Sequence, residues 1–282
     1  MKEEYADLHV HTFYSDSTFS PNEVAEMASK KGLKAIAICD HDCVDGIAPT
    51  EEAARPYGIE VIPGVELTIE EDDAEIHILG YFIDYKDQDL LKSLKRFQEG
   101  RIGRIYKMLE LLKDKGIDIR PEEVFELAGD GSVGRPHVAL AMLKAKKINY
   151  LQEAFNEYIG DGKPCYVGHL KFAPSEAIEM IKKSGGVPVL AHPMVGARDE
   201  FIPKLIKFGL RGIEVYHSDH NKSYEKKYLE IAKAENLVVT GGSDCHGLSK
   251  KTVLMGKVKV PYSLVLKLKE EADKIKAAQK HA

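Results

Sequence analysis

Alternation of polar and apolar residues marks the beginning of the chain. Residues 5–11 follow a period of two, which is typical of a β-strand and places His9 and His11 on one face of it. Residues 34–39 form an apolar run, the pattern of a strand buried on both faces. Such runs predict seven strands, at residues 5–11, 34–39, 60–65, 75–81, 187–191, 212–216 and 237–240.

Helical patterns separate most of these strands. Ser20 can cap a helix, Pro21 suits its first position and Glu23 completes a capping box, so a helix is expected to run from there to about Gly32. Further helices are expected at residues 48–57, across residues 87–163 and after residue 261. Alternating strands and helices predict a parallel α/β architecture.

Side chains of metal-ligating type follow six of the seven predicted strands. In a barrel, the carboxyl ends of the strands carry the chemistry, whereas an open doubly wound sheet concentrates it at one switch point. Candidates on so many strands therefore favour a closed or nearly closed barrel.

Composition narrows the class of protein. The chain has 282 residues, 44% of them hydrophobic, which is enough for a substantial core. It shows no signal-peptide pattern and no apolar run of the roughly 20 residues that span a membrane, and its four Cys form no CxxC pair. We therefore expect a reduced, cytoplasmic protein without a membrane partner. A net charge of −5 argues against a stable complex with long nucleic acid, although bound metal ions can make one pocket cationic.

Nine candidate metal ligands stand at or just after the predicted strand ends. Each has an ordinary explanation when taken alone, as a turn residue, a helix cap or a core histidine. Together, imidazole and carboxylate suit Mn²⁺, Fe or Zn²⁺, and nine ligands are too many for one ion, so two to three ions per chain are expected. Three divalent ions and three carboxylates would leave a site of about +3, suited to phosphate. The candidates are His9, His11, Asp16, His41, Glu66, His77, His192, Asp244 and His246.

These residues lie in motifs that resemble those of PHP (polymerase and histidinol phosphatase) domains. The motifs are Asp7-Leu8-His9-Val10-His11, Ser15-Asp16, Cys39-Asp40-His41-Asp42, Pro63-Gly64-Val65-Glu66, His77, Ala191-His192-Pro193 and Ser243-Asp244-Cys245-His246. They occur in order within residues 1–86 and 166–260. Two further elements, Gly134-Arg135-Pro136-His137 and Gly162-Lys163-Pro164, resemble the branch that contains 3′,5′-nucleoside bisphosphate phosphatases and the 5′→3′ exoribonuclease RNase AM.

The resemblance implies an α/β fold, a distorted (β/α)7 barrel with an inserted small helical domain. The barrel would comprise residues 1–86 and 166–282, and residues 87–165 would cap the active site. It also implies a trinuclear centre, often with manganese. One ion would be held by His9, His11, Glu66 and Asp244, a second by Glu66, His77 and His192, and a third by Asp16, His41 and His246. Catalytic roles are expected for Glu66, which would bridge two ions, and for Asp244 and His192.

Two arginines lie on the apolar stripe of a helix expected at residues 89–113. The stems of Arg101 and Arg104 could pack while their charges reach water. Alternatively, this face looks into the cleft and the two guanidinium groups bind phosphate.

A second candidate phosphate site is the expected helix start at Arg135 and His137. Helix starts attract anions through free N–H groups, and the resemblance supports this use. Lys163 is a further candidate. The remaining histidines are His169, His217 and His220, one of which could be a general acid, and His281, which is assigned to the tail.

The function expected from these features is metal-dependent hydrolysis of phosphomonoesters. A barrel site beneath a basic insertion suits a substrate with two phosphates, so we expect release of the 3′-phosphate from nucleoside 3′,5′-bisphosphates, or degradation of 5′-phosphorylated short oligoribonucleotides from the 5′ end. Histidinol-phosphate phosphatase activity is the alternative within the fold. An amidohydrolase-type hydrolase, which also begins with HxH, and a non-catalytic PHP accessory module are alternatives of other classes.

Overall fold

The fold is seen in a computed structural model that describes residues 3–71, 74–129, 131–168, 173–195, 199–248 and 252–280. Within these ranges, eight strands form one sheet in the order β7-β6-β5-β4-β3-β2-β1-β8. The strands are β1 (Tyr5–Val10), β2 (Ala35–Ile38), β3 (Glu60–Glu71), β4 (Ala74–Tyr81), β5 (Val187–Leu190), β6 (Gly212–His217), β7 (Val238–Gly242) and β8 (Val260–Pro261).

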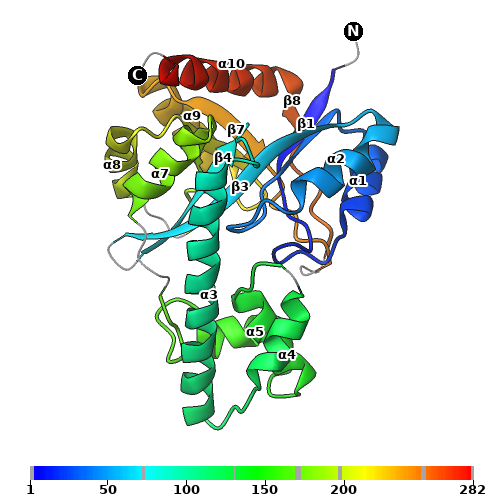
Figure 1. Ribbon diagram of the computed structural model, residues 1–282, viewed down its shortest axis with the longest axis vertical. Coiled ribbons are helices and arrows are strands. Elements are labelled where there is room, and N and C mark those ends of the chain that lie inside the picture. Colours follow the sequence, from blue (N-terminus) through cyan, green and yellow to red (C-terminus); the bar gives the residue numbers. More distant parts are fainter. Residues whose placement is uncertain are drawn as a thin grey trace.

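The sheet curls into a nearly closed barrel (Figure 1). At the carboxyl end of β1, hydrogen bonds join it to the chain that follows β7. The backbone N–H of His11 donates to the oxygen of Cys245 at 3.1 Å, and the backbone N–H of Asp244 donates to the oxygen of His9 at 2.9 Å. At the amino end of β1, β8 pairs with it, and Tyr5 lies opposite Pro261. The predicted α/β barrel is therefore confirmed, with β8 as a short eighth strand that the sequence patterns did not indicate.

Two strands differ from the expected arrangement, β4 in its direction and β3 in its length. β4 runs antiparallel to both β3 and β5. A parallel pair needs a crossover of a dozen or more residues, and only two residues separate β3 from β4. In addition, β3 extends to Glu71 rather than ending before Glu66. Glu66 therefore lies in the middle of a strand, and the expectation that it follows a strand end is wrong.

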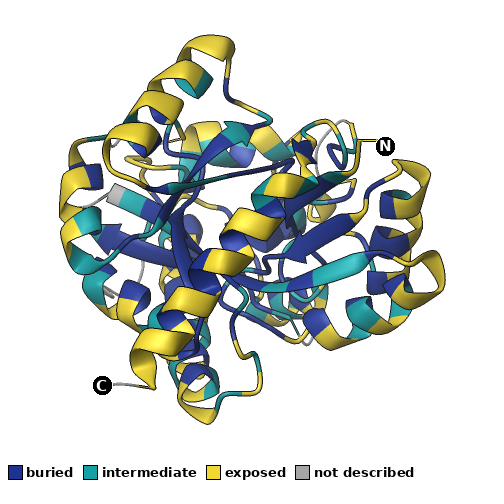
Figure 2. Ribbon diagram, turned by 90° about the horizontal axis from the view of Figure 1, so that it is seen from above, coloured by how far each residue is buried: buried dark blue, intermediate teal, exposed yellow. Residues whose placement is uncertain are grey.

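Helices cover the outside of the barrel with their buried faces turned inward (Figure 2). The first of them starts as predicted: Ser20 Oγ accepts the N–H of Glu23 at 3.4 Å, and the Glu23 carboxylate accepts the N–H of Ser20 at 2.8 Å. The expected helix at residues 48–57 is a helix followed by a 3-10 turn. The helices and turns on the barrel are α1 (Pro21–Lys30), α2 (Ile47–Ala54), η1 (Arg55–Tyr57), α7 (Pro174–Lys183), η3 (Asp199–Phe201), α8 (Ile202–Phe208), α9 (Lys222–Ala234) and α10 (Tyr262–Gln279).

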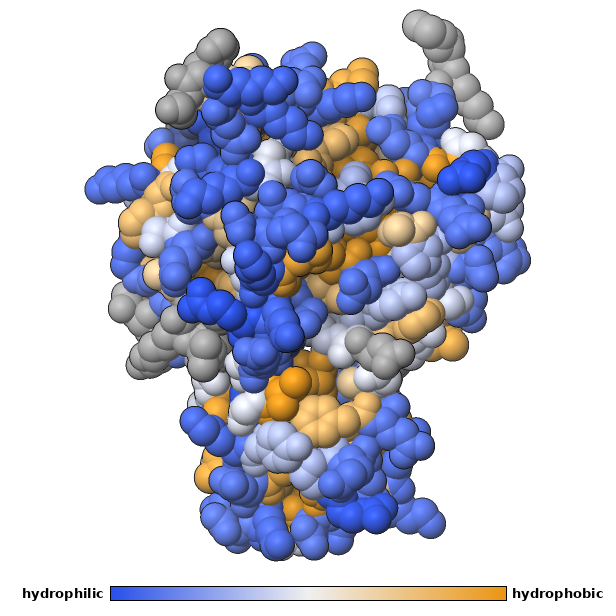
Figure 3. All heavy atoms as spheres, viewed as in Figure 1, coloured by the Kyte–Doolittle hydropathy of each residue, from blue (hydrophilic) through white to orange (hydrophobic). Residues whose placement is uncertain are grey.

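A helical lobe lies below the barrel, and α3 runs from one into the other (Figure 1). Figure 3 shows this lobe as a narrower body. Its elements are α3 (Gln88–Asp114), α4 (Pro121–Ala128), α5 (Arg135–Lys144), α6 (Leu151–Ala154) and the π-helical turn η2 (Phe155–Ile159). Leu90 and Phe97 of α3 pack in the core of the barrel, whereas Ile105 and Leu112 pack in a separate core. The change between cores falls within α3, so this helix packs in both the barrel and the helical lobe.

None of the helices in the described ranges is long and apolar enough to cross a membrane.

Candidate metal centre

All nine candidate ligands lie at one edge of the barrel, the carboxyl end of its parallel strands. His9 is in β1 and Glu66 in β3, while His41 and His192 follow β2 and β5. Because β4 runs in the opposite direction, His77 near its start reaches the same edge. The others follow β1 or β7: His11, Asp16, Asp244 and His246.

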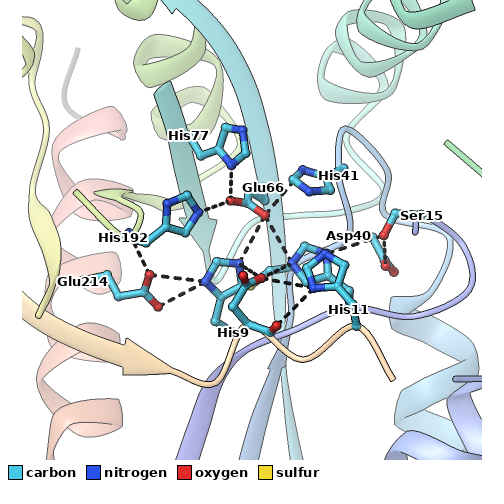
Figure 4. Close-up of polar contacts among 12 residues, drawn as sticks. His9, His11, Ser15, Asp40, His41, Glu66, His77, His192 and Glu214 are labelled. Carbon is cyan, nitrogen blue, oxygen red and sulfur yellow. Dashed lines mark hydrogen bonds and ion pairs between the residues drawn. The ribbon is translucent and has the colours of Figure 1, made fainter. Parts of the chain in front are cut away.

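The carboxylate of Glu66 is the centre of the cluster, and its side chain is only 1% exposed (Figure 4). Two imidazole nitrogens face its Oε1: His77 Nδ1 at 2.7 Å and His192 Nε2 at 3.0 Å. Three face its Oε2: His9 Nε2 and His11 Nε2 at 3.2 Å, and His41 Nδ1 at 3.4 Å. One carboxylate thus stands among five imidazoles, an arrangement suited to bridging two ions.

Three groups in the cluster have ligand atoms within 4.8 Å of one another. These groups are His9, His11, Glu66 and Asp244; His11, Asp16, His41 and His246; and His41, Glu66 and His77. His11 and His41 each occur in two groups, whereas the sets implied by the family resemblance share only Glu66. His192 is in none of the groups, although its Nε2 faces Glu66.

Three residues at this edge have positive φ angles, which residues other than glycine rarely adopt. The φ angles of Asp42, His192 and Asp244 are 50°, 22° and 53°. Such positions cost roughly 1–3 kcal/mol each and persist where neighbouring contacts hold them. Each of the three backbone N–H groups donates to a residue of the site: Asp42 to the oxygen of Glu66 at 2.9 Å, His192 to Glu214 Oε2 at 2.8 Å and Asp244 to the oxygen of His9 at 2.9 Å.

The electrostatics of the cluster keep its carboxylates ionised. Burial alone would raise the pKa of the Glu66 carboxyl, but the imidazoles of His77 and His9 hold that pKa well below its usual range. Burial would likewise lower the pKa of His77, yet Glu66 and Glu75 raise it to about 10. By contrast, burial holds the pKa of His41 well below its usual value, helped by positively charged neighbours. One shared carboxylate cannot stabilise a proton on every imidazole around it.

The donor set fits bound metal ions. Among the described residues, the buried His192 Nδ1 has no hydrogen-bond partner, and the contacts of His11 Nε2 and His41 Nδ1 with Glu66 lack the geometry of a hydrogen bond. Leaving such atoms without a partner is costly. Imidazole and carboxylate are ligands that a divalent transition-metal ion binds together, so such an ion would satisfy these atoms. The residues present therefore suit divalent transition metals.

Two buried carboxylates that the sequence analysis did not single out support the cluster. Glu214 in β6 is fully buried and accepts from His9 Nδ1 at 3.1 Å. Asp40 accepts from the backbone N–H of Thr12 at 2.7 Å and from Ser15 Oγ at 2.7 Å, which fixes the loop that leads to Asp16. A signal existed for Glu214, because a charged residue in the middle of an apolar strand pattern needs a buried partner.

The structure places Arg101 and Arg104 away from water. Their exposed fractions are 7% and 5%, so the interpretation in which their charges reach solvent is wrong. Arg101 Nε donates to Asp42 Oδ2 at 2.5 Å and its NH2 group to Thr68 Oγ1 at 2.7 Å. Arg104 Nε donates to the oxygen of Val167 at 2.6 Å.

The other three candidate phosphate-binding residues lie in or after α5. Arg135 contacts carboxylates with both terminal nitrogens, NH1 to Asp161 at 2.7 Å and NH2 to Glu75 at 2.9 Å. His137 Nδ1 accepts the N–H of Gly134 at 3.0 Å, which completes the start of the helix. Lys163 is exposed in the turn after η2.

A pocket connects the cluster to the helical lobe. His77 and His192 lie on its barrel side, and Arg135 and Asp161 on its lobe side. The lining also includes an apolar wall made of Ile76, Leu190, Pro193, Val195, Phe201 and Leu205. A substrate in this pocket can therefore reach the candidate ligands and the lobe at once.

The remaining histidines are distributed unevenly around the site. His217 is 3% exposed and its Nε2 lies 3.6 Å from Asp244 Oδ2. His220 Nδ1 contacts the oxygen of Val215 at 2.7 Å, on the far side of His217 from the cluster. His217 is thus the nearer of the two to the candidate ligands. His169 and His281 lie outside the described residues.

The model of the PHP domain matches residues 7–183 of the chain. The chain belongs to the PHP family. The match contains six of the nine candidate ligands, and the structure adds the other three at the same edge of the barrel.

Three relatives cover most of the chain. A 3′,5′-nucleoside bisphosphate phosphatase of Chromobacterium violaceum is 31% identical over 85% of this chain and 86% of its own length. A 5′-3′ exoribonuclease of Haemophilus influenzae is 34% identical over 85% of this chain and 89% of its own. A phosphoribosyl 1,2-cyclic phosphate 1,2-diphosphodiesterase of Eggerthella lenta is 29% identical over 86% of this chain and 94% of its own.

Solved structures share the whole architecture. A protein from Bifidobacterium adolescentis, assigned as a metal-dependent phosphoesterase, superposes with a TM-score of 0.86 at 30% identity and covers 93% of this chain and 94% of its own. A protein of Chromobacterium violaceum described as an amidohydrolase has a TM-score of 0.83 at 27% identity, with 96% of both chains covered. Family, relatives and ligand cluster together identify the chain as an enzyme, a metal-dependent phosphoesterase of the PHP family.

Proposed function

We propose that this phosphoesterase removes the 3′-phosphate from nucleoside 3′,5′-bisphosphates or shortens 5′-phosphorylated oligoribonucleotides from the 5′ end. Two relatives that are 31% and 34% identical are named for these two activities. Both substrate classes carry two phosphate groups, so the enzyme must bind one phosphate where it reacts and another at a distance.

The pocket is the observation that carries the proposal. It is lined by His77 and His192 from the barrel, by Arg135 from the helical lobe and by an apolar wall. The reacting phosphate would lie at the histidine end and the remote phosphate at Arg135, where a guanidinium can bind two phosphate oxygens at once. The apolar wall would contact the base or the ribose. His137, Lys163, Arg101 and Arg104 would add to the positive side of the pocket.

The nine candidate ligands would hold two to three ions, with Mn²⁺ as the first choice and Fe or Zn²⁺ as alternatives. When bound, these ions would supply the activation of water and the neutralisation of charge on the phosphoryl oxygens. Glu66 and Asp244 would fix the positions of the ions, and His192 would hold the side of the cluster that faces the pocket. Glu214 would orient His9 by accepting its Nδ1–H, which leaves Nε2 free to act as a ligand.

The helical segment 87–165 would act as a cap. Arg101 joins this segment to Asp42 beside His41, and Arg135 joins it to Glu75 beside His77. Cap and barrel would thus form one binding site, in a cytoplasmic enzyme whose substrates are small nucleotides or short oligonucleotides.

A panel of substrates tests the proposal. Manganese-loaded enzyme would be assayed with adenosine 3′,5′-bisphosphate, a 5′-phosphorylated RNA trimer, histidinol phosphate, phosphoribosyl 1,2-cyclic phosphate and a small aryl phosphate. A nucleotide with two phosphates should have the highest kcat/KM. A clear preference for histidinol phosphate or for the cyclic phosphodiester would overturn the nucleotide assignment.

The Arg135→Ala variant sharpens the test. A charge-assisted hydrogen bond contributes roughly 1.5–3 kcal/mol, so kcat/KM for the bisphosphate should fall about 10- to 100-fold through a rise in KM. Turnover of the aryl phosphate, which has no second phosphate, should barely change. Arg120→Ala is the matched control, because Arg120 is a 75% exposed arginine of the same segment. Equal losses on both substrates would place Arg135 at the reacting phosphate instead.

A further inference from the structure

Two carboxylates contact the guanidinium group of Arg135, and they differ in burial and in their other partners. NH2 donates to Glu75 Oε1 at 2.9 Å and NH1 to Asp161 Oδ1 at 2.7 Å. Both carboxylates line the pocket that contains His77 and His192. A substrate phosphate that approaches Arg135 in this pocket is therefore repelled by both carboxylates.

Among the described residues, Glu75 contacts His77 of the barrel and Arg104 and Arg135 of the helical lobe. Its side chain is 13% exposed, and its Oε1 also lies 3.2 Å from His77 Nε2. Its Oε2 lies 3.4 Å from the NH2 group of Arg104. Removing a buried carboxylate from such a set is costly, because each cation or donor it leaves behind loses its partner.

Asp161 has a different environment. Its side chain is 68% exposed, in the turn between η2 and Gly162. An ion pair with so exposed a carboxylate is weak, because water and salt compete with it. The two carboxylates and the two guanidinium groups of Arg104 and Arg135 sum to zero charge. If Asp161 leaves, the group has a net charge of +1, which favours an anion.

We propose that Asp161 is an exchangeable counter-ion that the remote phosphate of the substrate replaces on Arg135, whereas Glu75 is a positioning residue that remains in place. The proposal rests on the proposed function of the pocket. Glu75 would keep Arg104 and Arg135 directed at the remote phosphate and would orient His77 by accepting its Nε2–H. His77 Nδ1, 2.7 Å from Glu66, is then the nitrogen available to a metal ion. One side chain would thus align both ends of the substrate site.

The two carboxylates should respond to substitution in opposite directions. Asp161→Asn keeps the size of the side chain and removes the competing charge, so KM for adenosine 3′,5′-bisphosphate should fall by up to about fivefold, the strength of an exposed ion pair, with kcat unchanged. Hydrolysis of an aryl phosphate, which has no second phosphate to bind Arg135, should respond less. Asp118→Asn, an exposed aspartate of the same lobe, is the matched control.

Glu75→Gln should instead weaken both ends of the site. The variant removes the negative charge and one acceptor oxygen, and altering the partner behind a metal-binding histidine typically reduces metal affinity or activity 10- to 100-fold. Calorimetric titration of the metal-free protein with Mn²⁺ should show that loss without any turnover. KM for the bisphosphate should rise rather than fall. Unchanged Mn²⁺ affinity would overturn the positioning role of Glu75.

Inhibition separates this inference from the proposed function. Adenosine 3′,5′-bisphosphate would be used as an inhibitor of aryl phosphate hydrolysis in the wild type and in Asp161→Asn. A lower inhibition constant in the variant supports the exchange, whether or not the bisphosphate is hydrolysed. Absence of hydrolysis would refute only the proposed function. An inhibition constant that is unchanged or higher in Asp161→Asn overturns the exchange, whichever substrate the enzyme prefers.

Discussion

Glu214 offers a sharp test of how the barrel orients the candidate ligands. Its carboxylate is fully buried and accepts two hydrogen bonds, from His9 Nδ1 at 3.1 Å and from the backbone N–H of His192 at 2.8 Å. Glu214→Gln keeps the shape of the side chain, but an amide has one oxygen and one NH2 group. The oxygen can accept from one of the two donors, and the NH2 group then faces the other.

The expected magnitude follows from that mismatch. A buried donor without an acceptor costs about 1–3 kcal/mol, so the free energy of unfolding of the metal-free protein should fall by that amount. If His9 is the donor that loses its acceptor, its tautomer is no longer fixed and Nε2 becomes a poorer ligand. A 10- to 100-fold loss of Mn²⁺ affinity, about 1.4–2.8 kcal/mol, is expected.

Two measurements check this prediction. Calorimetric titration of metal-free protein gives the dissociation constant of Mn²⁺, and urea unfolding gives the change in stability. Glu235→Gln, an exposed glutamate just after α9, is the control for the loss of one negative charge. If Glu214→Gln binds Mn²⁺ within twofold of the control and unfolds at the same urea concentration, the orienting role of Glu214 is refuted.

Three further predictions concern the metal centre. Elemental analysis of protein purified without chelator should find two to three transition-metal ions per chain, and a reproducible value of one or fewer in metal-replete protein would contradict the assignment of nine ligands. Glu66→Gln and Asp244→Asn should each lower kcat for an aryl phosphate by orders of magnitude while the far-ultraviolet circular dichroism spectrum stays unchanged, and near-wild-type turnover in either variant would remove that residue from the site. The pKa values of His11 and His77, raised to about 9 and about 10 by the adjacent carboxylates despite burial, leave both imidazoles protonated at neutral pH in the metal-free protein. Bound metal must displace those protons, so Mn²⁺ binding should release protons in a weakly buffered solution and its affinity should rise as the pH increases toward about 10. An affinity that does not change with pH would show that no protons of these imidazoles are displaced.

Local sequence was enough to predict the elements that depend on local interactions. The strand that carries His9 follows from its period of two, and the start of α1 follows from the hydrogen bonds that Ser20 and Glu23 exchange within one helical turn. The nine candidate ligands could be named for the same reason. Each one lies in or beside an element that its own neighbours specify, and the carboxyl ends of barrel strands meet at one edge.

The direction of β4 is a feature that the local sequence pattern could not predict. Its alternation is the same for a parallel and an antiparallel strand, and the short connection to β3 decides between them. Glu66 was expected at the end of a strand because the apolar run ends at Val65. The strand continues to Glu71 because β4 pairs with it over its full second half. The carboxylate of Glu66 can be buried in the middle of this strand because imidazoles surround it.

Partners that lie far apart in the sequence were decided by the tertiary structure alone. Glu214 and His9 are 205 residues apart, and Arg101 and Asp42 are 59 residues apart. The sequence showed that arginines stand on the apolar stripe of α3, but the carboxylate that each contacts depends on how α3 packs against the barrel. The same holds for Arg135, which the sequence places at a helix start and the fold places between Glu75 and Asp161. The sequence thus determined which chemical groups gather at the barrel edge. Packing determined which of them are held in place and which remain exchangeable, because burial, and not residue type, sets how strongly a charge needs its partner.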